Sequence, residues 1–271
     1  MKSPVKLLLL LMLLLPCQTL RGTYGFLTKH EGTAPITKFT VIAERASGSN
    51  YMEALMMFNA MIPTVPFFHK HFPPWYELPL EKYFGEKNFY TFENTDDYLF
   101  IVIFRNPYDW VRSLYRQPHL ASVEMRSASF DAFLHRPWEL DKRDPLFAAE
   151  YKYNPLLDRN PRTGAPFENI LKLRTTKAKN MLMIKDKAKN VYFINYEVVR
   201  DHPQEVLAEI SKIYQVPLKS SYTPIVHYKG HTALPLYKGS KYRPLTPDQI
   251  LYINSQLDKE LEAQLGYSLQ N

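Results

Sequence analysis

Two kinds of apolar pattern alternate along the chain after residue 37. Short, mainly apolar, β-rich runs stand at 39–42, at 98–104 (YLFIVIF) and at 191–194, and they predict strands. The run at 98–104 does not alternate with polar residues, which predicts that both faces of this strand are covered. Between and after these runs, apolar residues recur at helical spacing over 50–61, 108–115, 167–183 and 203–214. This alternation predicts a parallel sheet with helices packed against it.

A last helix is predicted near the carboxyl terminus. Thr246 can cap it, Pro247 suits its first turn, and Gly266 lies just past its expected end at Leu265. With 271 residues, the chain is long enough for one large domain and short for two. We therefore expect an α/β fold, a three-layer sandwich with a central, mainly parallel sheet, in one domain over 37–271.

The first 22 residues have a different pattern. Lys2 and Lys6 form a basic region before an unbroken apolar run over 7–15, which Pro16 closes. The layout is that of a secretory signal peptide, and the run is shorter than the about 20 residues of a membrane-spanning helix. We expect 1–22 to be a signal peptide or an uncleaved signal-anchor, with a buried N-terminal helix as the alternative.

This segment also predicts location. A signal places the protein in the secretory pathway, in the Golgi lumen or outside the cell, and the cytoplasm is the alternative. Membrane contact is expected only through this segment, if it is not cleaved.

Charge and cysteine content narrow the chemistry. A formal net charge of +7 favours an anionic partner, such as a nucleotide, an acidic glycan or an acidic membrane. No Lys/Arg run is dense enough for a nucleic-acid tail, so no nucleic-acid partner is expected. Cys17 is the one cysteine, which excludes disulfides, thiolate zinc sites and a cysteine nucleophile from the predicted domain.

A loop of sequence ERASGSN (44–50) joins the first predicted strand to the first predicted helix. Backbone N–H groups and the positive end of a helix converge at such a loop and form an anion site, with an ordinary capped turn as the alternative. Gly48 permits close approach, and the Walker A pattern is absent. The candidate binding residues of the loop are Arg45, Ala46, Ser47, Gly48, Ser49 and Asn50.

A second polar element follows the strand predicted over 98–104. Arg105 stands at the carboxyl end of that strand, the edge at which open α/β sheets bind ligands. Ser113 lies two helical turns further on, so it can share a ligand with Arg105. Trp110, between them, is expected to serve packing.

The two elements together resemble the sulfotransferases that use 3′-phosphoadenosine 5′-phosphosulfate. The resemblance implies that the loop binds the 5′-phosphosulfate and that Arg105 and Ser113, which match an Arg-(x)7-Ser element, bind the 3′-phosphate. Ser47-Gly48-Ser49 matches the core of the family's loop. The chain departs from the family at Ala46, where a basic residue usually stands, and Arg45 lies one position earlier. The nucleotide donor is thus the expected co-substrate.

A third stretch, HKHFPP (69–74), resembles the Lys-x-His-x-Pro setting of the family's catalytic histidine. The resemblance implies that His71 is the general base and that Lys70 supplies charge near the transferred group, together with Arg45. The alternative is that both histidines lie on a surface loop. No carboxylate or Cys stands at ligand spacing, so no metal is expected.

Two further basic features are less specific. Lys229-Gly230 loosely resembles a late loop that closes the 3′-phosphate site in some family members. The Lys and Arg residues of 167–183 are expected to form a solvated face. The acceptor, a hydroxyl or amine of a carbohydrate or small molecule, would be set by loops such as 116–166 and 219–244.

Two other functions remain open at this point. A nucleotide-dependent kinase of related fold would need a lysine in the loop, and that lysine is missing. A non-catalytic protein that binds a nucleotide or glycan on the same scaffold is the other alternative.

Overall fold

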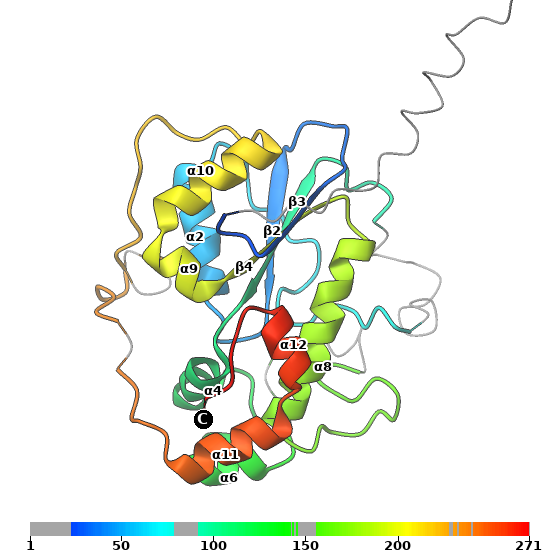
Figure 1. Cartoon of the computed structure of the whole chain (residues 1–271), viewed down its shortest axis with the longest axis vertical. Helices are drawn as coiled ribbons and strands as arrows, with labels where there is room; N and C mark the ends of the chain where they lie inside the picture. The colour runs from blue at the N-terminus through cyan, green and yellow to red at the C-terminus, as the bar shows by residue number, and fades with distance from the viewer. Residues whose placement is uncertain are drawn as a thin grey trace, which may run out of the picture.

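The structure is a computed structural model that describes residues 23–78, 92–141, 143, 145, 156–227, 230–231, 233–239 and 241–270. It shows an α/β fold with a four-stranded, mostly parallel sheet flanked by helices (Figure 1). The predicted signal segment 1–22 lies outside the described residues. No helix in the described part of the chain is both long and apolar enough to cross a membrane.

The sheet has the strand order β1-β4-β3-β2. Its strands are β1 (Leu27–His30), β2 (Lys38–Ala43), β3 (Tyr98–Phe104) and β4 (Asn190–Asn195). β2, β3 and β4 run parallel, and β1 pairs antiparallel with β4 at the edge. Every residue of β3 is buried, as its unbroken apolar sequence predicted, because helices cover both faces of the sheet.

Helices lie on both faces of the sheet (Figure 1). One face packs against α2 (Ser49–Asn59), α9 (Tyr196–Asp201) and α10 (Pro203–Tyr214), and the other against α8 (Ile170–Leu182), η2 (Met183–Asp186) and α12 (Lys259–Gln264). The remaining described helices are α4 (Pro107–Arg116), α5 (Val123–Arg126), α6 (Phe130–His135) and α11 (Pro247–Gln256). Two apolar cores, one on each side of the sheet, follow from this arrangement.

The predicted last helix is divided in two. Thr246 caps α11 with its side chain, as expected, but the chain is extended at Leu257 and α12 begins after Asp258. The Asp258 side chain accepts a hydrogen bond from the backbone N–H of Leu261 and so caps a new helix. Gly266 has a φ of +85°, which suits its predicted place just past the end of α12.

β1 was not identified from the sequence. Its four residues, LTKH, have no apolar run, and it is held by pairing with β4, from Leu27 opposite Phe193 to His30 opposite Asn190. The strand precedes residue 37, at which the predicted domain begins.

Candidate functional site

A cavity of about 640 Å³ opens where β2 and β3 end. The segments that follow these strands line it, together with α4 and parts of 69–71, 116–119 and 225–237. Most of the predicted site residues meet there. Those that line the cavity are Arg45, Ala46, Gly48, Ser49, Asn50, Lys70, His71, Arg105 and Ser113.

The loop after β2 is compact because its backbone takes two left-handed conformations. Ala46 has a φ of +62° and Gly48 a φ of +90°. A Cβ on Gly48 would come within 2.1 Å of Cδ2 of Tyr196, so the loop packs directly against that ring. Ser47 is buried and does not line the cavity.

Gly48 is the N-cap of α2 and offers no side-chain acceptor to its first amides. The first turn of α2 also has no acidic residue. By contrast, Asn106 caps α4 and Asn169 caps α8 with their side chains. The N-terminus of α2 therefore meets the cavity without a protein side chain from its cap, which is the electrostatic setting of an anion site.

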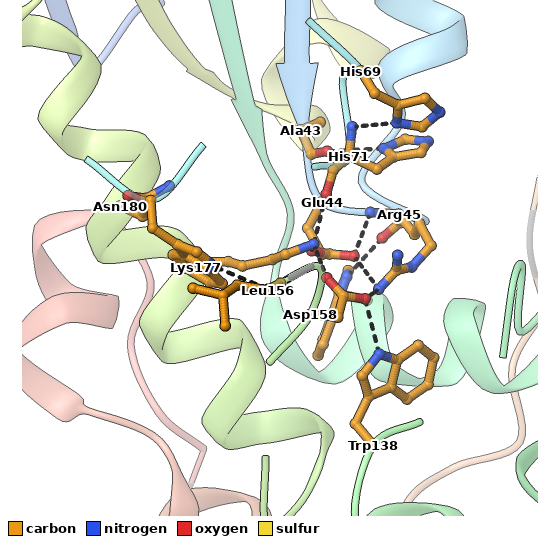
Figure 2. Close-up of polar contacts among 12 residues, drawn as sticks. Ala43, Glu44, Arg45, His69, His71, Trp138, Leu156, Asp158, Lys177 and Asn180 are labelled. Carbon is orange, nitrogen blue, oxygen red and sulfur yellow. Dashed lines mark hydrogen bonds and ion pairs between the residues drawn. The ribbon is translucent and has the colours of Figure 1, made fainter. Parts of the chain in front are cut away.

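Arg45 is among the residues that line the cavity, but its side chain is buried beneath this loop. Its side chain is 1% exposed. Its Nη2 forms ion pairs with Asp158 and with Glu44, the latter at 3.1 Å (Figure 2). Its Nε and Nη1 have no hydrogen-bond partner among the described residues. Burial alone would raise the pKa of Asp158, but the charges of Arg45 and Lys177 and the hydrogen bonds to the carboxylate together hold that pKa below its usual range.

The solvated basic face expected for the helix over 167–183 is found only in part. Lys179 is exposed, whereas Arg174 and Lys177 are buried, and this corrects the expectation for these two residues. Arg174 and Lys177 are 4% and 2% exposed. Lys177 pairs with Asp158 and, at 2.6 Å, with Glu44, while Nε of Arg174 pairs with Glu262 at 2.7 Å. The helix turns these charges inward because buried carboxylates neutralise them there.

His71 is placed to accept a proton. The residue is 8% exposed, and its Nδ1–H donates to the carbonyl oxygen of Ala43 at 2.9 Å (Figure 2). This bond fixes the proton on Nδ1 and leaves the lone pair of Nε2 as the basic site. Burial lowers the pKa of His71 well below its usual range, so the imidazole is neutral at physiological pH.

His69 has the opposite tautomer. Its Nδ1 accepts a hydrogen bond from the backbone N–H of His71 at 3.3 Å, and its ring stacks on Phe72 at 4.7 Å. Burial, and then the charge of Lys177, lower the pKa of His69 to about 4. Because its lone pair is already used, His69 is the less suitable base.

Lys70 lines the cavity but is already paired. Its Nζ donates to Oδ1 of Asn50 at 2.6 Å and to Oε2 of Glu53 at 2.8 Å, both from α2. The ammonium group lies next to the start of α2 as a result, close to the candidate anion site.

Arg105 connects the two predicted elements. It is 7% exposed, and its Nη1 donates to the carbonyl oxygen of Ala46 at 2.8 Å. Its guanidinium lies 4.7 Å from the ring centroid of Tyr196, and its Nη2 donates to the hydroxyl of Tyr242 at 3.0 Å. Trp110 is fully buried, and its Nε1 donates to the carbonyl oxygen of Arg45 at 2.8 Å, consistent with packing.

Of the late Lys-Gly pair, the structure describes only Gly230. Lys229 lies outside the described residues. Gly230 does not line the cavity and packs against α2, where an added Cβ would meet Cβ of Ala54 at 2.2 Å. His227 and Tyr237, from the same segment, do line the cavity.

Sequence reasoning missed Asp158, Lys177, His119 and Tyr196. His119 lines the cavity with its ring centroid 6.4 Å from that of His71. Asp158 has no sequence signal, because it pairs with a residue 113 positions away. Lys177 did have a sequence signal, because it lies next to Ala178 on the apolar, buried side of α8.

Comparison with protein families and with curated proteins identifies no relative of this chain. No protein-family model matches the chain, and no curated protein matches it. Across the described ranges, no three or more His, Cys, Asp or Glu side chains gather in a way that could hold a metal ion.

Proposed function

We propose that the chain is a sulfotransferase that moves a sulfuryl group from 3′-phosphoadenosine 5′-phosphosulfate to an acceptor hydroxyl or amine. One observation carries the proposal: a single cavity brings together the loop at the start of α2, the Arg105–Ser113 element and the lone pair of a neutral His71. The sheet with helices on both faces fits the three-layer sulfotransferase sandwich with its P-loop-like arrangement.

The residues present fit the nucleotide donor. The uncapped N-terminus of α2 and Ser49 suit the 5′-phosphosulfate, because they offer donors and a positive dipole end. Arg105 and Ser113 suit the 3′-phosphate. Nε of Arg45 and Nε of Arg105 are buried without a hydrogen-bond partner among the described residues, which is what an anion-binding site leaves open.

The chemistry asks the protein for positioning and charge stabilisation. The donor supplies the sulfuryl group: sulfur bonds to the acceptor oxygen or nitrogen as its bond to the bridging oxygen of the 5′-phosphate breaks, and that oxygen keeps the electron pair. Nε2 of His71 takes the acceptor's proton. Lys70 and the first amides of α2 stabilise the charge on the leaving phosphate, and Arg45 adds positive charge from beneath the loop.

The acceptor is a carbohydrate or small molecule of polar or anionic character. No Asp or Glu lines the cavity among the described residues, whereas Lys70, Arg116 and His119 do. An anionic group on the acceptor would therefore meet no repulsion from a carboxylate of the lining. The signal-like sequence of 1–22 supports a reaction in the secretory pathway.

A radiolabel assay tests the proposal. Purified protein is incubated with ³⁵S-labelled donor and a panel of sugars, phenols, amines and acidic glycans, and transfer of label is measured. The expected result is label on at least one acceptor, lost with His71→Ala. Tight nucleotide binding with no transfer to any class, and no change on substitution of His71, would favour a non-catalytic binding protein instead.

A further inference from the structure

Helix α8 carries three buried polar side chains in one line. Arg174, Lys177 and Asn180 are three residues apart, so they share one face of the helix, and they are 4%, 2% and 3% exposed. Figure 2 shows Lys177 and Asn180 reaching from α8 toward the segments that carry the candidate site. We call these three residues the α8 polar line.

Each member of the α8 polar line binds the backbone of a site segment. Nη2 of Arg174 donates to the carbonyl oxygen of Arg105 at 2.9 Å, and Nζ of Lys177 donates to the carbonyl oxygen of His71 at 2.6 Å. Asn180 donates to the carbonyl oxygen of Pro74 at 2.8 Å and accepts from the N–H of Tyr76 at 2.8 Å. One helix thus holds, by hydrogen bonds, the backbone of two predicted site residues, Arg105 and His71, and of the segment that follows His71.

The charges of this line are satisfied within the protein. Lys177 donates a hydrogen bond to the His71 carbonyl and forms ion pairs with Glu44 and Asp158. Arg174 is paired with Glu262 through two bonds of 2.7 and 2.8 Å. Neither cation is among the residues that line the cavity, so neither is placed to contact a bound substrate.

We propose that Lys177 and Arg174 are positioning residues: through α8 they fix the spacing between the proton acceptor His71 and the phosphate-binding Arg105. The inference rests on the proposed sulfuryl transfer. About one turn of helix separates Arg174 from Lys177. The helix therefore holds His71, the base, at a fixed distance from Arg105 in the nucleotide site. A displacement of about 1 Å at a reacting group can lower a rate by about 10²-fold, which is why such a clamp matters.

The test removes the Lys177 bond without leaving an unpaired buried charge. The variant Lys177→Met/Asp158→Asn deletes one cation and one carboxylate together, and Asn tolerates the positive φ of +48° at position 158. Lys177→Arg keeps the charge and the donors. Lys179→Met is the matched control on the same helix, because Lys179 is 52% exposed and pairs only with Asp258 in the described structure.

We expect the double variant to lose roughly 10- to 100-fold in kcat while its Kd for 3′-phosphoadenosine 5′-phosphate stays within about 3-fold. Lys177→Arg should recover part of kcat, and Lys179→Met should change neither value. A merely structural role would lower kcat only in proportion to the loss of folded, nucleotide-binding protein. That result, or an unchanged kcat, would overturn the proposal.

A second measurement does not depend on transferase activity. The ¹⁵N shifts of the His71 imidazole report which ring nitrogen carries the proton. In the natural protein we expect the Nδ1–H tautomer alone, and in the double variant a mixture, because His71 is no longer held against Ala43. Unchanged shifts would refute the positioning role. Absence of nucleotide binding by the natural protein would refute the proposed function instead, so the two failures are distinguishable.

Discussion

At the scale of single residues, the two histidines of 69–71 have different capacities to act as a base. Nε2 of His71 has a free lone pair, whereas Nδ1 of His69 already accepts a hydrogen bond. Turnover of His71→Ala should fall by roughly 10²–10⁴-fold, the usual contribution of a general base, with nucleotide affinity nearly unchanged. His69→Ala should lose far less.

Turnover and nucleotide affinity of both histidine variants in one assay check this prediction. If His69→Ala is the inactive variant, the base is assigned to the wrong histidine. If neither variant slows, a different base acts. Glu44 is a poor substitute in that case, because it pairs with Arg45 and Lys177 at 3.1 and 2.6 Å.

The pH dependence follows from the environment of the same residue. Burial disfavours the charged imidazolium and lowers the pKa of His71 below the about 6.5 of an exposed histidine. The neutral, active form therefore persists as the pH falls through 6.5, and the acid limb of kcat/KM should lie below that value. A kcat/KM profile from pH 4 to 9 tests this, and an acid limb at or above pH 6.5 would contradict it.

At the scale of elements, the loop between β2 and α2 depends on Gly48. Alanine at this position must adopt a φ of +90° and would clash with Tyr196 at 2.1 Å. We expect Gly48→Ala to cost about 1–3 kcal/mol of unfolding free energy and to weaken nucleotide binding at least about 10-fold. Gly164→Ala is the control, because it shares a positive φ of +71° but its nearest neighbour is 3.9 Å away.

Thermal denaturation and calorimetry of both glycine variants measure these effects. The control should lose some stability through backbone strain and keep its nucleotide affinity. Equal affinities in Gly48→Ala and the natural protein would show that this loop does not hold the nucleotide.

Helices and strands were largely predictable where the local sequence pattern determines them. β3 has the predicted bounds, 98–104, because an unbroken apolar run suits a strand covered on both faces, and α10 begins at the predicted Pro203. β1 and the break at Leu257 were not predictable. The first depends on pairing with β4, and the second on the burial of Leu257 and a cap at Asp258.

The motifs of the candidate site were predictable from the sequence, but the buried ion pairs beneath them were not. The loop 44–50, Arg105, Ser113 and His71 have sequence patterns of their own, and the fold brings Arg105, Ser113, His71 and most of the loop to one cavity. The buried pairing of Arg45 with Asp158 joins residues 113 positions apart, so it arises from tertiary structure alone. The charge expected from Arg45 at this loop is therefore a buried one, held beneath the loop by carboxylates.

At the scale of the whole molecule, the N-terminal segment predicts where the protein acts. Residues 1–22 have the layout of a secretory signal, so the native protein should enter the secretory pathway, where the donor must be imported from the cytosol. Cell fractionation with N-terminal sequencing tests this. A native protein that keeps Met1 and fractionates with soluble cytosol would contradict it.

The central claim, that this cavity holds a 3′-phosphorylated adenine nucleotide, is tested most directly by calorimetry. Full-length protein is titrated with 3′-phosphoadenosine 5′-phosphate and with 5′-AMP, which lacks the 3′-phosphate. Loss of charge-assisted hydrogen bonds to Arg105 and Ser113 should weaken 5′-AMP binding by about 2–5 kcal/mol. Arg105→Met should remove most of that difference. Equal affinity of the natural protein for the two nucleotides would contradict the account.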